Sequence, residues 1–147
     1  MTTTPAADNF NAQIDRILWP VIQNGQLVDR PINTVAEAKL YQREVSGIQT
    51  QLRGVKKDVN LYKKQVRLSY GNAQTNASNH PILGMIAGRK AANHLRAQDK
   101  QRLRVREHNA LLPYDAVIDR IDRCLLTLDK VKLEIDRMVQ TGRITQR

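Results

Sequence analysis

Lysine and arginine side chains are concentrated in two segments of this 147-residue chain. The segment RKAANHLRAQDKQRLRVREH, Arg89 to His108, holds seven cations and two acids, and residues 53–67 hold six cations and one acid. Ammonium and guanidinium groups bind phosphate oxygens, and one guanidinium can donate two parallel hydrogen bonds to the same phosphate. These residue types at this density predict a surface that binds a polyanion.

The formal net charge of +10 comes almost entirely from these two parts of the chain. Residues 53–67 and 82–112 each carry a net charge of +5, and every other segment lies within one charge of neutral. Charge of this sign attracts phosphate backbones, anionic membranes and acidic proteins. If the two segments fold back against each other, their charge forms one patch in space.

Each segment also shows a basic face on a helical wheel of about 100° per residue. The acids at i and i+4 that would relieve repulsion are missing there, whereas residues 113–147 carry Asp115, Asp119, Asp122, Asp129 and Asp136. A compensating anion outside the chain explains this pattern. We therefore predict a nucleic-acid-binding surface made of Arg53, Lys56, Lys57, Lys63, Lys64, Arg67, Arg89, Lys90, Arg96, Lys100 and Arg104.

The expected mode of binding is sequence-independent contact with the phosphates of DNA or RNA. Cations spaced along two helices can follow a phosphate chain, and each neutralised phosphate releases bound counterions. Aromatic residues make up only 4% of the chain, so stacking platforms for bases are scarce. Helix-turn-helix, zinc-finger and ribonucleoprotein signatures are absent from the sequence. Membrane binding is disfavoured because the basic stripes lack a bulky apolar face.

Catalytic and metal-binding patterns are missing. His80, His94 and His108 recur every fourteen residues, which on one helix separates the last two by about 21 Å, too far to share an ion. The sequence shows no glycine-rich phosphate loop, no paired carboxylates in a cleft-forming context and no nucleophile beside a base. We expect no enzymatic activity, no cofactor and no metal.

A single cysteine, Cys124, lies in an apolar periodic run and is expected to be a buried, unreactive thiol. One cysteine forms no internal disulfide, which favours the reducing cytoplasm. The N-terminal sequence MTTTPAADNF lacks the features of a signal peptide, and no apolar run approaches the ~20 residues of a membrane span. We therefore expect a cytoplasmic protein.

The elements that must hold the cations are predicted to be helices. Thr34 and Glu37 have the spacing of a capping box, which begins a helix. Apolar residues then alternate at spacings of three and four, as in a coiled-coil seam: Ala38, Tyr41, Val45, Ile48, Leu52, Val55, Val59, Tyr62 and Val66. A second seam contains Val117, Ile121, Cys124, Leu128, Val131, Ile135 and Met138, and Gly142 suits the position after its C-terminal cap.

The predicted fold is all-α, a long antiparallel coiled-coil-like helical hairpin with a small helical bundle at its base. Pro113 is expected to kink or break the last helical stretch. The segment NGQLVDRPIN is expected to be an irregular connection. The predicted boundaries are a flexible N-terminus at 1–7, one all-helical domain at 8–141 and a tail at 142–147; within the domain come helices 8–23 and 34–69, a loop at 70–81, and helices 82–112 and 113–141.

A second interpretation uses the same features. Coiled-coil seams specify helices without saying whether the partner helix belongs to the same chain or to another copy. The chain is on this view a structural or adaptor protein that forms a homo-oligomer, or docks an acidic partner protein, through its helical hairpin.

Overall fold

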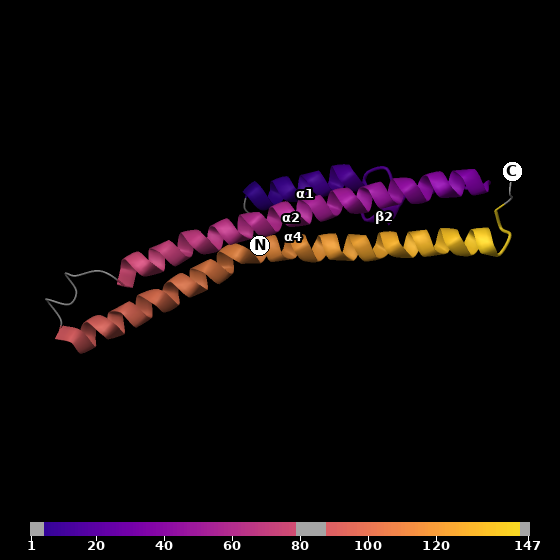
Figure 1. Ribbon diagram of the computed structural model, residues 1–147. Helices are drawn as coiled ribbons and strands as arrows, with labels where there is room; N and C mark the ends of the chain where they lie inside the picture. Colours follow the sequence, from indigo (N-terminus) through magenta and orange to yellow (C-terminus); the bar gives the residue numbers. More distant parts are fainter. Residues whose placement is uncertain (1–4, 79–87, 145–147) are drawn as a thin grey trace. The chain divides into compact units, whose positions relative to one another are not determined.

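The computed structural model of the chain describes residues 5–78 and 88–144, and side chains within 5–71 and 97–144. In chain order the elements are α1 (Pro5–Leu18), β1 (Ile22–Gln23), β2 (Gln26–Leu27), α2 (Val35–Ser78) and α4 (Gly88–Gln140). The two long helices pack against each other in opposite directions, and the short α1 adds to them (Figure 1). The predicted all-α class with a long helical hairpin is confirmed.

The residues group into two compact units, where the sequence predicted one domain. Unit 1 comprises Met1–Val59 and Ala116–Arg147, and unit 2 comprises Asn60–Asp115. Each long helix therefore contributes one part to unit 1 and another part to unit 2. Unit 1 also contains α1 and the two short strands.

The start of α2 follows from its capping residues. The Glu37 backbone N–H donates to Thr34 Oγ1 at 3.2 Å, and the Glu37 carboxylate accepts from the Asn33 backbone N–H at 2.8 Å. These bonds satisfy backbone donors that have no partner inside the helix. The predicted capping box is confirmed, with the return bond going to the residue before Thr34.

The core of unit 1 is the predicted seam. Seven seam residues of α2 are buried, and Leu52 and Val59 are fully so: Ala38, Tyr41, Val45, Ile48, Leu52, Val55 and Val59. The facing part of α4 buries Val117, Ile121, Leu128 and Ile135, while Cys124, Val131 and Met138 are half-buried. The alternation of three and four residues keeps these side chains on one face of each helix, so they meet in a continuous core.

Residues 19–27 form a tight turn and a β-hairpin, which corrects two predictions. The sequence predicted a helix up to residue 23 with a bend or a stop around Trp19 and Pro20; α1 stops at Leu18, and residues 22–23 form β1. Asn24 and Gly25 have φ of 52° and 77°, the left-handed pair that a two-residue hairpin turn requires, and they join β1 to β2. The segment predicted to be an irregular connection thus begins within an ordered hairpin.

The long helices differ from the prediction in length. Helix α2 continues to Ser78, so residues 70–78 of the predicted loop are helical, and the rest of that loop lies outside the described residues. No proline interrupts residues 35–78. Once a helix has formed, each further residue adds one backbone hydrogen bond at a small cost in free energy. Helix α4 runs through Pro113 without a break, so the separate helices predicted at 82–112 and 113–141 are one element from Gly88.

The end of α4 matches its prediction. Gly142 has φ of 72°, the Arg143 backbone N–H donates to the Met138 carbonyl at 3.1 Å, and the Gly142 N–H donates to the Val139 carbonyl at 3.4 Å. This is the Schellman arrangement, which a glycine makes at least cost. It turns the chain back, and Ile144 is buried at 3% exposure.

Candidate nucleic-acid interface

A series of polar contacts joins α2 to α4 in unit 1 at intervals of seven residues. Gln42 Nε2 donates to Asp136 Oδ1 at 2.6 Å, and Gln49 Nε2 donates to Asp129 Oδ1 at 2.7 Å. The next member is an ion pair from Lys56 Nζ to Asp122 Oδ1 at 2.7 Å. Seven residues are about two helical turns, so these residues share one side of each helix. We call this set the aspartate ladder.

Gln49 is the buried member of the aspartate ladder. Its side chain is 1% exposed, and its amide also donates to the Leu125 carbonyl at 3.4 Å. A buried amide without partners is costly, so this residue pairs well only when α2 and α4 are in the observed register.

Unit 2 contains a pair of the same type. Lys63 Nζ lies 2.5 Å from Asp115 Oδ1, and the Lys63 side chain is only 13% exposed. Next to it the rings of Tyr62 and Tyr114 lie 4.9 Å apart between centroids at an angle of 42°. Lys63 is seven residues after Lys56, and Asp115 is seven before Asp122, so the pair has the spacing of the aspartate ladder.

Two predicted phosphate-binding lysines therefore have intramolecular partners. Lys56 and Lys63 each contact an aspartate of α4, which neutralises part of their charge. The sequence suggested that the aspartates of residues 113–147 relieve charge repulsion within their own helix. Asp119 does so, because its Oδ2 lies 2.9 Å from Arg123 Nη2, four residues later on α4. The heptad spacing of Asp115, Asp122, Asp129 and Asp136 was the signal that could have identified the interhelical pairs.

The remaining predicted cations with described side chains are exposed. In unit 1 these are Arg53 and Lys57, and in unit 2 they are Lys64, Arg67, Lys100 and Arg104. Among the side chains within 5–71 and 97–144, no carboxylate forms an ion pair with any of them. Their charge is thus available to an external anion.

In unit 2 the Lys63–Asp115 pair marks the side on which four of these cations lie. Arg67 follows Lys63 by four residues on α2, an offset of about 40° around the helix. Arg104 precedes Asp115 by eleven residues on α4, three turns with an offset of about 20°. Lys64 and Lys100 lie within about 100° of the same markers. We call Lys64, Arg67, Lys100 and Arg104 the basic face of unit 2.

Two further arginines of α4 point elsewhere. Arg102 and Arg106 are exposed, and their offsets from Asp115 are about 140° and 180°, so they lie on the other side of the helix from Arg104. They provide cations of the same helix and unit that do not belong to the basic face. Arg89, Lys90 and Arg96 lie on the helical backbone of α4, and their side chains lie outside those that the structure describes.

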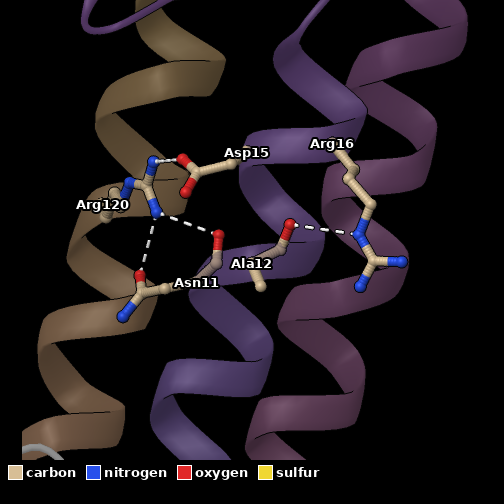
Figure 2. A network of polar contacts seen from close by, with 5 residues as sticks. All are labelled: Asn11, Ala12, Asp15, Arg16 and Arg120. Carbon is tan, nitrogen blue, oxygen red and sulfur yellow. Dashed lines mark hydrogen bonds and ion pairs between the residues drawn. The ribbon is translucent and has the colours of Figure 1, made fainter.

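Unit 1 uses another arginine to attach α1. The Arg120 guanidinium pairs with Asp15 Oδ1 and donates to Asn11 Oδ1 at 3.0 Å and to the Asn11 carbonyl at 3.3 Å. Figure 2 shows this guanidinium reaching from α4 to two successive turns of α1. Since its donors are used inside the unit, Arg120 is a structural residue.

Cys124 lies one turn after Arg120 and is half-buried. Burial raises the pKa of the thiol, and the nearby Arg120 guanidinium offsets that effect only in part. A thiol with a raised pKa holds little thiolate at neutral pH, which agrees with the expectation of an unreactive residue.

Comparison with protein-family models, with curated proteins and with solved structures finds no match for this chain. Within residues 5–78 and 88–144, no helix is long and apolar enough to cross a membrane. Among the side chains described within 5–71 and 97–144, no three histidine, cysteine or acidic groups gather as a metal site would require. The arrangement of cations is therefore the feature on which a function can be argued.

Proposed function

We propose that the chain is a non-catalytic protein that binds nucleic acid through sequence-independent phosphate contacts. The observation that supports this is the exposed basic face of unit 2, whose cations have no ion-pair partner among the described side chains. Unit 2 holds ten lysines and arginines and three acids, a net charge of +7 of the total of +10. A surface of this kind attracts a phosphate backbone at long range and binds it by releasing counterions.

The contacts are made by side chains of two different helices. Lys64 and Arg67 come from α2, and Lys100 and Arg104 come from α4. The two arginines can each hold a phosphate through two hydrogen bonds, and the lysines act as point charges. Arg53 and Lys57 extend the set within unit 1. Lys56 and Lys63 are left out because their ammonium groups are paired with aspartates.

Binding of labelled DNA and RNA duplexes and single strands at several salt concentrations tests the proposal. We expect the logarithm of the affinity to fall linearly with the logarithm of salt concentration, with a slope of roughly −0.9 for each duplex phosphate neutralised. Absence of binding at low salt contradicts the proposal.

A matched pair of variants separates the basic face from charge in general. The double variant Lys100→Glu and Arg104→Glu should weaken binding strongly and reduce the salt slope. The control, Arg102→Glu and Arg106→Glu, makes the same charge change on the same helix but on the other side. Equal losses in the two variants would show that total charge, and not this face, determines binding.

A second candidate function is that of a structural or adaptor protein. Leu61, Leu68, Val105 and Leu112 of unit 2 are between 43% and 59% exposed, and each helix carries its two at a spacing of seven residues. Exposed apolar residues in rows along a basic hairpin can pack against an acidic partner protein or against a second copy of the chain. Light scattering of the purified chain tests for the defined oligomer that the structural or adaptor function predicts. Nuclease treatment of complexes isolated from cells separates the two candidates: a protein complex survives it, whereas a nucleic-acid complex is lost. We place either function in the cytoplasm because the chain has a single, half-buried cysteine.

A further inference from the structure

Unit 1 contains a cation-lined hollow that none of the predicted nucleic-acid contacts uses. It has a volume of about 470 Å³ and lies between the first turns of α2 and the last turns of α4. Its lining residues are Lys39, Gln42, Arg43, Ser46, Lys132 and Asp136. Three of the six are cations and one is an acid, so the lining carries a net charge of +2.

The single acid of the hollow is already engaged. Asp136 accepts a hydrogen bond from Gln42 Nε2 at 2.6 Å, and the same amide donates to the Lys132 carbonyl at 3.3 Å. These contacts belong to the aspartate ladder and fix the two walls of the hollow relative to each other. The carboxylate keeps its charge in this hydrogen bond, so it offsets one of the three cations and leaves the lining with a net charge of +2.

The cations of the hollow come from both walls. Lys132 Nζ of α4 reaches Ser46 Oγ of α2 at 3.4 Å, so its ammonium group lies across the hollow. Lys39 and Arg43 are one turn apart on α2 and both exposed, a like-charge spacing that destabilises a helix slightly. No ion pair involves any of the three among the side chains of 5–71 and 97–144.

We propose that this hollow binds a single phosphoryl group in its dianionic form. A phosphate monoester carries a charge of about −1.5 to −2 at pH 7, which matches the +2 of the lining. Its oxygens accept hydrogen bonds, and the hollow offers a guanidinium, two ammonium groups and the Ser46 hydroxyl as donors. The ligand bridges α2 and α4 of unit 1, and the site needs none of the four cations of the basic face.

Titration of the full chain with inorganic phosphate at constant ionic strength tests this site. We expect saturable shifts of the backbone amide NMR signals of Arg43, Ser46 and Lys132, with chloride at the same ionic strength producing none. Lys132→Gln should weaken the affinity roughly tenfold, because a charge-assisted hydrogen bond is lost. Arg43→Gln provides a second variant from the other wall, and circular dichroism verifies that each variant keeps its helicity.

The control variant is Lys130→Gln, which removes the same charge two residues away on α4 and does not line this hollow. It should change phosphate affinity by less than about twofold, the range of a distant screened charge. Shifts that do not saturate, or equal losses in Lys130→Gln and Lys132→Gln, overturn the proposal.

Two ligands distinguish a free small molecule from a nucleic-acid phosphate as the source of the group. Adenosine monophosphate presents a monoester dianion, and a DNA strand without a terminal phosphate presents only backbone monoanions. Saturable binding of the first at this hollow, with no displacement by the second, assigns the site to small phosphate monoesters, and displacement by the strand overturns the assignment to a dianion. The variant Lys100→Glu and Arg104→Glu should keep phosphate binding, so failure of this site and failure of the proposed function are separate results.

Discussion

The two units use the same pair of helices but bury very different parts of them. In unit 1 every seam residue of α2 from Ala38 to Val59 is buried. In unit 2 no described side chain of 60–71 or 97–110 is buried, and its described core consists of Leu111 and Tyr114. Unit 1 also contains α1 and the β-hairpin (Figure 1), and Ile14 and Val21 in this part of the chain are fully buried. Among the described side chains, the seam forms an extended buried core in unit 1, the unit that also contains α1 and the hairpin.

The units also differ in their balance of cations and acids. Unit 1 holds fourteen cations and eleven acids, and unit 2 holds ten cations and three acids. The acids that face α2 end with Asp115, because the residues seven and fourteen positions before it are His108 and Gln101. Beyond that point the cations of α2 meet no carboxylate at the ladder position of α4. Among the described side chains, the loss of the acids thus coincides with the loss of buried seam residues.

Amide hydrogen exchange should show the largest difference between the units. Residues without buried side chains exchange through local opening that requires less free energy than global unfolding. We expect amides in 60–71 and 97–110 to exchange on the order of 100-fold faster than those at 45–55 and 121–135. Equal protection in the two units would mean that unit 2 is stabilised by contacts other than side-chain burial.

Truncation of a leucine in each unit should give the next largest contrast. Leu128 of unit 1 is fully buried, and Leu128→Ala should lower the free energy of unfolding by about 2–5 kcal/mol through lost burial and the cavity left behind. Leu68 of unit 2 is 59% exposed, and Leu68→Ala should change it by less than about 0.5 kcal/mol. Urea denaturation measures both. A large effect of Leu68→Ala would reveal a partner surface, such as a second copy packed on this row.

The parts of the fold that could be predicted are those set by local rules. Thr34 begins α2 because its side chain satisfies an end N–H, and Gly142 ends α4 because it accepts positive φ at little cost. The seam residues followed from helical periodicity alone. The sequence also places Asn24 and Gly25 side by side, the strongest short hairpin signal, but strands of two residues are too short for an alternating pattern to show.

The interhelical partners could not be read from either helix alone. Lys56 and Lys63 look like members of a basic stripe when only α2 is considered, and their pairing depends on the register of α4. Turn-forming residues in 70–78 predicted a loop, yet asparagine, glycine and serine lower helix propensity by less than about 1 kcal/mol each, and helix propagation overrides that. Lys64, Arg67, Lys100 and Arg104 are exposed, and their binding of nucleic acid stays a prediction. The aspartate partners of Lys56 and Lys63 were missed.

The buried glutamine of unit 1 offers a test of what sets the register. Asp129→Ala leaves Gln49 buried with only the 3.4 Å bond to the Leu125 carbonyl, and should cost about 1–3 kcal/mol of unfolding free energy. Asp136→Ala is the matched control, because its partner Gln42 is only half-buried and can be hydrated, and should cost about 1 kcal/mol or less. Thermal unfolding followed by circular dichroism measures both. If the two costs are equal, burial of Gln49 is not what makes its position in the aspartate ladder special.

The smallest expected difference is between the two ion pairs of similar spacing, one in each unit. Lys63 of unit 2 is 13% exposed and Lys56 of unit 1 is 36% exposed at the side chain, while their aspartates are about equally exposed. Double-mutant cycles with Lys→Met and Asp→Asn should give a coupling of about 0.5–1 kcal/mol for Lys63 with Asp115, and about 0.2–0.5 kcal/mol for Lys56 with Asp122. Added salt should reduce the second coupling more than the first, because a more exposed pair is better screened. A stronger and less salt-sensitive coupling at Lys56 would reverse this order and show that burial of the lysine does not determine the strength of these pairs.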